Sequence, residues 1–208
     1  MTYGLRPDAD YFAADIAVDT TGTTFTLVHG DERQKFSTKL IGAANVENIV
    51  GALAAANGYG IPLADLVPAV RTLRAVPHRM ELLDRGAVTI IDDAFNSNPA
   101  GAAAALETLG RFDAMRIIVT PGMIELGDRT DALNAELGAR AAAVCDCIVA
   151  VGEKQAKPIL RGAREAGADE KKLYTAKNFA DAMRYVSALD AGGRKKVVLL
   201  ENDLPDNF

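Results

Sequence analysis

A stretch near the middle of the chain, Val88–Pro99, constrains the fold most strongly. It opens on Val-Thr-Ile-Ile, a short β-branched run of the kind that forms a strand buried on both faces. Pro99 suits the first position of a helix, and Asn98 or Ser97 can cap the free N–H groups there. The stretch therefore predicts a strand, a polar turn and an alanine-rich helix ending at Gly110. The turn contains two carboxylates and two carboxamides, Asp92, Asp93, Asn96 and Asn98.

The same pattern repeats downstream, where apolar runs end in acids, amides and glycine rather than in ordinary turn residues. Strands are expected at 80–83, 88–91, 115–120, 147–151, 172–175 and 196–200. Helices are expected near 100–109, 131–145, 154–167 and 177–189. This alternation predicts a right-handed parallel sheet covered by helices, with 80–83 antiparallel to 88–91 and the direction of the last strand left open. Because such sheets bind ligands at the carboxyl ends of their strands, the polar turns form a candidate site.

The first 75 residues have a different character. Strands are expected at 11–18, 24–29 and 35–40, with a hairpin turn across Gly30 and Asp31. Thr2–Leu5 is expected to be a strand whose neighbours lie outside this sequence, which indicates a piece of a longer protein. Helices follow at 46–57 and 63–73, and Asn45 is placed to cap the first of them. Val76–Arg79 indicates a hinge that divides the chain into domains 1–75 and 76–208.

Composition excludes several classes of protein. The 208 residues are 49% hydrophobic and 25% charged, enough for a substantial core. The net charge of −5 and the lack of a basic patch argue against a nucleic-acid partner. No apolar run approaches the ~20 residues that cross a bilayer, and no signal segment is evident, so we expect no membrane insertion. Cys145 and Cys147 are expected to be core thiols in a reducing, cytoplasmic setting.

Four motifs carry a resemblance to a known family. They are Gly42-x-x-Asn45-x-x-Asn48, Arg79-x-Glu81, Asp92-Asp93-Ala-Phe-Asn96-Ser-Asn98-Pro99 and Gly122-Met-Ile-Glu125-Leu-Gly127. Their order and spacing resemble the Mur ligases of peptidoglycan synthesis, ATP-dependent enzymes that join an amino acid or dipeptide to a UDP-muramoyl substrate. The last two motifs look most like the branch that adds D-alanyl-D-alanine to the UDP-muramoyl-tripeptide. The close of the chain, from Glu201 to Asn207, is similar to that of some bacterial members of this branch.

The resemblance implies an α/β fold with a Rossmann-like C-terminal domain and a mostly parallel sheet. The β-rich and helical residues before it would be a remnant of the central ATPase domain. It also implies two groups of site residues, with no catalytic residue and no metal ligand among them. Nucleotide-binding residues would be Asn45, Asn48, Arg79 and the pair Asp92 and Asp93. Substrate-binding residues, facing the incoming amine, would be Asn96, Asn98, Met123 and Glu125.

Three features of the sequence depart from the family. No G-x-x-x-x-G-K-[ST] phosphate loop occurs, and the magnesium-binding carboxylates and histidine of the family's central domain are absent. Ala44 stands where histidine is usual, and Phe95 likewise replaces a common tyrosine. The resemblance implies that the full-length enzyme uses ATP and Mg²⁺, and that UDP-MurNAc-peptide and D-Ala-D-Ala are its partners. We expect a monomer, and no ligase activity from this chain alone.

Three alternatives stay open at this point. The first is a ligase of the same family with another amino-acid acceptor. The second is a non-catalytic binding module that kept the fold, which Ala44 and the missing phosphate loop favour. The third, a generic doubly wound nucleotide binder, fits less well because no G-x-G-x-x-G follows any predicted strand.

Overall fold

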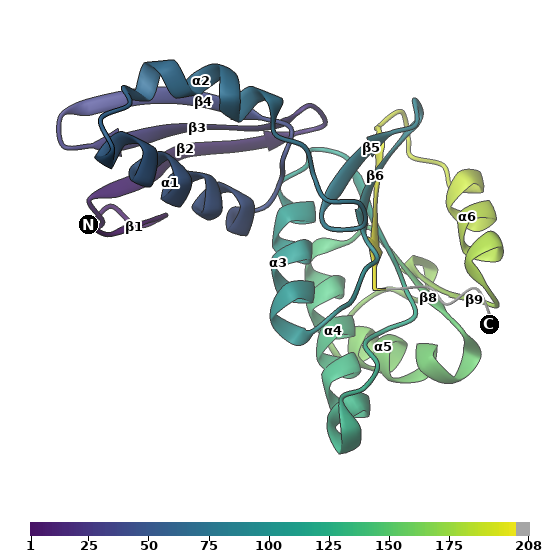
Figure 1. Cartoon of the computed structure of the whole chain (residues 1–208). Helices are drawn as coiled ribbons and strands as arrows, with labels where there is room; N and C mark the ends of the chain where they lie inside the picture. The colour runs from purple at the N-terminus through teal and green to yellow at the C-terminus, as the bar shows by residue number, and fades with distance from the viewer. Residues whose placement is uncertain (203–208) are drawn as a thin grey trace. The chain divides into compact units, whose positions relative to one another are not determined.

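A computed structural model describes residues 1–202 and divides the chain into two compact units, Met1–Val76 and Pro77–Phe208 (Figure 1). Each unit has its own sheet and its own apolar core. The change of unit lies within the segment Val76–Arg79, where the composition of the sequence changes. We describe the two units one at a time.

Unit 1 contains a four-stranded sheet in the order β1-β2-β3-β4. The strands are β1 (Tyr3–Gly4), β2 (Tyr11–Asp19), β3 (Gly22–His29) and β4 (Glu32–Thr38). The predicted hairpin is confirmed, because His29 pairs with Glu32 across Gly30, whose φ is 55°. The expectation that Thr2–Leu5 lacks a neighbour is wrong: β1 pairs with β2 in parallel.

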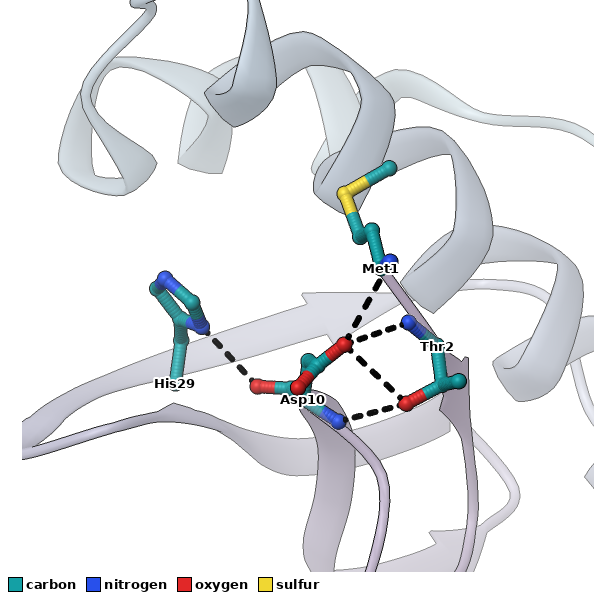
Figure 2. A network of polar contacts seen from close by, with 4 residues as sticks. All are labelled: Met1, Thr2, Asp10 and His29. Carbon is teal, nitrogen blue, oxygen red and sulfur yellow. Dashed lines mark hydrogen bonds and ion pairs between the residues drawn. The ribbon is translucent and has the colours of Figure 1, made fainter.

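Hydrogen bonds around Asp10 explain why β1 lies beside β2 (Figure 2). The Asp10 carboxylate accepts from the backbone N of Thr2 at 2.6 Å and lies 3.6 Å from the amino group of Met1. The Thr2 hydroxyl accepts in return from the backbone N of Asp10 at 3.0 Å. The hydrogen bonds from Thr2 also lower the pKa of Asp10. This local network holds β1 in place, and no periodic pattern in the sequence could indicate it.

Two helices, α1 (Ala43–Gly58) and α2 (Leu63–Thr72), cover one face of this sheet (Figure 1). Alternate residues of β3 point toward them, as expected for a strand with one buried face. Phe25 of β3 stacks on Phe36 of β4 with ring centroids 5.6 Å apart, and both rings are buried. Val50 and Leu53 of α1 complete this core.

Unit 2 contains a six-stranded sheet in the order β5-β6-β10-β7-β8-β9. The strands are β5 (Glu81–Asp84), β6 (Val88–Asp93), β7 (Met115–Thr120), β8 (Cys147–Val151), β9 (Leu173–Ala176) and β10 (Lys196–Glu201). Among the described strands of this sheet, only β5 is antiparallel to its neighbour. The direction of β10, which the sequence left open, is parallel to both β6 and β7. Its Val-Val-Leu-Leu run is buried on both faces, as a central strand requires.

Helices cover both faces of this second sheet (Figure 1). They are α3 (Pro99–Gly110), α4 (Thr130–Val144), α5 (Glu153–Glu165) and α6 (Phe179–Ala188), with 3₁₀ turns at Gly127–Arg129 and Glu170–Lys172. Helices α3, α4 and α5 lie on one face and α6 on the other, where Ala182 and Val186 pack on alternate strand residues. The predicted α/β fold with a mostly parallel sheet is confirmed.

Small residues bring α4 and α5 close together. A Cβ atom added to Gly138 would collide with the carbonyl oxygen of Ile159, and one added to Gly162 would collide with that of Ala135. The two helix backbones therefore touch directly, a spacing that only glycine permits at these positions.

The two cysteines are buried, as predicted. Burial raises the pKa of the Cys147 thiol to about 11, and that of Cys145 further still. Among residues 1–202, no helix combines the length and the apolar character that a bilayer crossing needs.

Candidate functional site

The carboxyl ends of β6, β10 and β7 meet at one edge of the second sheet. The register pairs Glu201 at the end of β10 with Asp93 at the end of β6. On the other side of β10, Leu200 pairs with Val119 near the end of β7. The segment after β6 (residues 94–98, here the β6 loop) and the segment after β7 (residues 121–126, the β7 loop) therefore start at the same edge of the sheet, one on each side of the end of β10. The sequence predicted this gathering of polar turns.

Asn202, immediately after β10, connects these segments to one another. Its backbone N donates to the carbonyl of Asp93 at 3.2 Å, and its side-chain oxygen accepts from the backbone N of Ser97 at 3.1 Å. Its side-chain nitrogen donates to the carbonyl of Gly122 at 2.6 Å. The residue is 1% exposed and has a φ of 72°, a left-handed conformation that asparagine tolerates better than most residues.

Glu201 forms a second link from β10 to the β6 loop. Its Oε1 accepts a hydrogen bond from the Ser97 hydroxyl at 2.5 Å, and the residue is 1% exposed. Its Oε2 is buried and has no hydrogen-bond partner among the described residues. Burial raises the pKa of Glu201 to about 8, the Ser97 hydrogen bond lowers it, and the charge of Asp93 raises it. At neutral pH this carboxyl group is therefore mostly protonated.

The β7 loop is fixed from a second direction by Asn134 of α4. The Asn134 side chain accepts from the backbone N of Met123 at 2.8 Å and donates to its carbonyl at 2.9 Å. Gly122, with a φ of 85°, lies so close to this amide that an added Cβ would be 2.6 Å from its oxygen. The result is a loop with a rigid base that presents Ile124 and Glu125 to solvent.

The first residues of unit 2 pack against the start of the β6 loop. His78 Nδ1 lies 2.9 Å from Asp92 Oδ2, and the carbonyl of His78 accepts from the backbone N of Phe95 at 3.1 Å. The Arg79 guanidinium lies over the exposed Phe95 ring, 4.4 Å from its centroid. His78 has a φ of 62°, so this turn carries some backbone strain.

The structure distinguishes the two aspartates that the resemblance pairs. Asp92 is 7% exposed, and its two oxygens accept from His78 and from the backbone N of Ala94. Asp93 is half-buried, and its Oδ1 accepts from the backbone N of Met80 at 3.1 Å. Burial raises the pKa of Asp93 against that hydrogen bond, while Arg79 lowers it. Asp93 is thus the more accessible carboxylate of the two.

The predicted substrate-binding residues occupy different environments on the two loops. Asn96 and Glu125 are exposed. Asn98 caps α3, because its side-chain oxygen accepts from the backbone N atoms of Ala100 and Gly101 at 3.1 and 2.9 Å. Met123 is 3% exposed, so its side chain belongs to the core beneath the β7 loop. Its contact with a substrate stays a prediction.

Asn45 and Asn48 belong to unit 1 and are described within it. The prediction that Asn45 caps the first helix is wrong. Helix α1 begins at Ala43, after Gly42, so Asn45 lies within the first turn. Its side-chain nitrogen instead donates to the carbonyl of Ile41 at 2.8 Å. Asn48 is exposed one turn further on. Contacts of these residues with a nucleotide stay predictions.

Sequence reasoning missed the residues that hold the loops. They are the buried polar side chains Ser97, Asn134, Glu201 and Asn202. The hydrogen bonds of Glu201 and Asn202 reach 80 or more positions along the chain, whereas Asn134 binds Met123, 11 positions away. The one signal in the sequence was the polar Glu-Asn pair directly after a fully apolar run. Within residues 1–202, no group of three or more His, Cys, Asp or Glu side chains is arranged to bind a metal ion.

Two protein-family descriptions match this chain. Residues 78–201 match the Mur ligase, glutamate ligase domain, which is more than half of the chain. Residues 1–56 match the Mur ligase middle domain.

Individual relatives agree with this match. The UDP-N-acetylmuramoyl-tripeptide–D-alanyl-D-alanine ligase of Escherichia coli (strain K12) is 28% identical over 199 residues, covering 93% of this chain and 44% of the relative. A UDP-N-acetylmuramoyl-L-alanyl-D-glutamate–2,6-diaminopimelate ligase of Halalkalibacterium halodurans is 33% identical over 133 residues, covering 62% of this chain and 26% of the relative. The crystal structure of MurF from Acinetobacter baumannii superposes on this chain with a TM-score of 0.76 at 25% identity. The match covers 98% of this chain and 43% of that structure's chain. The chain thus spans less than half the length of these proteins.

Proposed function

The chain belongs to the Mur ligase family, and from this premise we propose that it forms part of an ATP-dependent ligase that joins D-alanyl-D-alanine to a UDP-MurNAc-tripeptide. Residues 76–208 would be the C-terminal domain, and residues 1–75 part of the central domain. The resemblance to the family noted from the sequence is confirmed. The activity and substrates of the whole protein are our inference, supported by the relative from Escherichia coli that matches nearly the full chain.

The reaction we propose forms one amide bond for each ATP consumed. An oxygen of the terminal carboxylate of the UDP-MurNAc-peptide attacks the γ-phosphorus of ATP. This step forms an acyl phosphate and releases ADP. The amine of the dipeptide then attacks this acyl phosphate, inorganic phosphate leaves, and the amine loses a proton. Positioning and charge neutralisation supply most of the rate enhancement in such chemistry.

One observation carries the assignment of the amine substrate to unit 2. The edge formed by the β6 and β7 loops presents an exposed amide at Asn96 and an exposed acid at Glu125, on backbones fixed by buried hydrogen bonds. A dipeptide carries an ammonium at one end and a carboxylate at the other, and its peptide group both donates and accepts. Glu125 suits the ammonium and Asn96 suits the peptide group. Arg79 adds a cation near the start of the β6 loop.

A second candidate uses the same chemistry with a different amine, 2,6-diaminopimelate, and a shorter carboxylate substrate, UDP-N-acetylmuramoyl-L-alanyl-D-glutamate. The relative from Halalkalibacterium halodurans, which adds 2,6-diaminopimelate, has the higher identity over a shorter segment. Diaminopimelate also has ammonium and carboxylate groups, so the exposed residues of the two loops suit it as well. The longer match and the fold similarity to MurF favour D-alanyl-D-alanine.

The test compares this chain with the complete reading frame that contains it. We expect phosphate release from the complete protein to require ATP, UDP-MurNAc-tripeptide and D-Ala-D-Ala together. We expect none from the 208-residue chain, because it has no phosphate loop. A complete protein that binds these compounds without releasing phosphate would instead support the non-catalytic module.

A further inference from the structure

We propose that Asn202 and Glu201 are positioning residues that hold the β6 and β7 loops as one rigid unit for the amine substrate. The proposal rests on the function proposed above, because it assigns that substrate to these two loops. It concerns residues outside both predicted groups of site residues. Ser97, Glu201 and Asn202 together are called the β10 cluster.

The hydrogen bonds of Asn202 connect the two loops directly to each other. Its side chain joins Ser97, 105 positions away in the sequence, to Gly122, 80 positions away. The side chain uses its oxygen for one loop and its nitrogen for the other. Neither loop can move away from the other without breaking a buried hydrogen bond, which leaves an unpaired polar group in the interior.

Glu201 provides a second attachment of the β6 loop to β10. Its hydrogen bond to Ser97 holds the same residue that Asn202 binds, now through the side chain rather than the backbone. Ser97 lies between the two predicted substrate residues of the β6 loop, Asn96 and Asn98. The carboxyl group is buried, and its second oxygen has no partner among the described residues. An arrangement with an unsatisfied buried oxygen costs stability, which is typical of functional sites.

The consequence concerns the spacing of the residues that would bind the amine substrate. Glu125 stands on the β7 loop and Asn96 on the β6 loop, and both are exposed. A ligand held at both ends binds well only if the two contact points keep a fixed separation. The β10 cluster fixes the bases of both loops and touches solvent almost nowhere, as a positioning role requires.

The decisive variant is Asn202→Gly. Glycine adopts the left-handed φ of this position without strain, so the backbone is preserved while both side-chain hydrogen bonds are lost. The matched control is Asn178→Gly, which removes an exposed helix cap at the start of α6, away from the two loops. We expect both variants to keep their cooperative thermal unfolding.

The first measurement needs no ligand. By NMR on the 208-residue chain, Ser97→Ala should shift the amide signals of Met123 and Ile124, and this response should vanish in the Asn202→Gly background. Asn178→Gly should leave the response intact. An unchanged response in the Asn202→Gly background would overturn the proposal.

A measurement on the unchanged chain covers the case in which Asn202→Gly does not fold. In native-state hydrogen exchange, the amides of Ser97 and Met123 should open together, with one opening free energy and one dependence on denaturant. Separate opening of the two amides would contradict a single rigid unit.

The second measurement uses the complete ligase. Asn202→Gly should raise the KM for D-Ala-D-Ala by about tenfold or more, with the KM for ATP unchanged. An equal KM for the dipeptide in the variant and the native enzyme would overturn the positioning role and leave the proposed function standing. If the native enzyme shows no turnover with D-Ala-D-Ala, the proposed function is overturned. The NMR result would then still decide whether the two loops are coupled.

Discussion

Replacing Glu201 by glutamine should change how the stability of unit 2 depends on pH. The folded protein keeps a proton on Glu201 up to about pH 8, whereas the unfolded chain releases it near 4.5. Between these values the native state binds more protons than the unfolded state, so the free energy of unfolding falls as pH rises. Above the folded pKa both states are ionised and the dependence ends. Glu201→Gln removes this proton and with it this part of the pH dependence.

The magnitude follows from the size of the pKa shift. One pKa unit corresponds to about 1.4 kcal/mol, so the native protein should lose about 1.4 kcal/mol of stability per pH unit across the window. The full shift from 4.5 to about 8 sets an upper limit of about 5 kcal/mol. Asp93, the acid that pairs with Glu201 in the register, and the histidines are the same in both proteins. The difference between the two curves therefore isolates Glu201.

The assay is urea unfolding of the native chain and of Glu201→Gln at a series of pH values between about 5 and 9. Amide signals of β10 should be used as the probe, because the two units need not unfold together. We expect a clear downward slope for the native chain and a flatter line for the variant. Two parallel curves would refute the reasoning, since they would mean that Glu201 titrates like an exposed acid.

Three further predictions concern packing, capping and activity. Gly138→Ala should destabilise unit 2 by about 2 kcal/mol or more in urea unfolding, because the new Cβ collides with the Ile159 carbonyl. The control is Gly110→Ala, whose Cβ contacts only the side chain of Val144. Equal losses of stability in the two variants would contradict the close contact between α4 and α5. Asn98→Ala should cost about 1 kcal/mol through loss of the α3 cap, whereas Asn98→Asp should cost less; a larger loss from Asp would argue against capping. In the complete ligase, Glu125→Gln should raise the KM for the amine substrate about tenfold with little change in melting temperature, because Glu125 is exposed; an unchanged KM would exclude Glu125 from the site.

Sequence reasoning predicted the elements of unit 2 because their signals are local. The apolar runs at 115–120 and 196–200 became β7 and β10 without a shift in their cores. The insertion of β10 between β6 and β7 could not be predicted, since the order of strands depends on pairing between residues far apart in the sequence. The same reason explains the error at β1, whose partner is set by the hydrogen bonds between Thr2 and Asp10.

The sequence predicted which edge of the sheet holds the candidate site, but not the buried hydrogen bonds that hold its loops. Polar turns after several strands indicated the functional edge of the sheet, and the loops with Asn96 and Glu125 do begin at that edge, on either side of β10. Glu201 and Asn202, which hold those loops from β10, are buried and make contacts across 80 positions or more. Such contacts leave no periodic trace in a single sequence. Of the two caps that the sequence offered for α3, Asn98 and Ser97, the structure shows Asn98 in that role. It also shows Asp92 bonded to His78 and Ala94, which the sequence did not indicate.

The most direct test of the account is the product that the complete ligase forms from an equal mixture of D-Ala-D-Ala and 2,6-diaminopimelate. The reaction should contain ATP together with UDP-MurNAc-L-Ala-D-Glu and UDP-MurNAc-tripeptide, each labelled with ¹⁸O in the carboxylate to be extended. Mass spectrometry should follow both the peptides and the phosphate. The account predicts a peptide extended by D-Ala-D-Ala, together with inorganic phosphate that has gained one ¹⁸O atom from the activated carboxylate. Extension by another amine, or phosphate without the label, would contradict it.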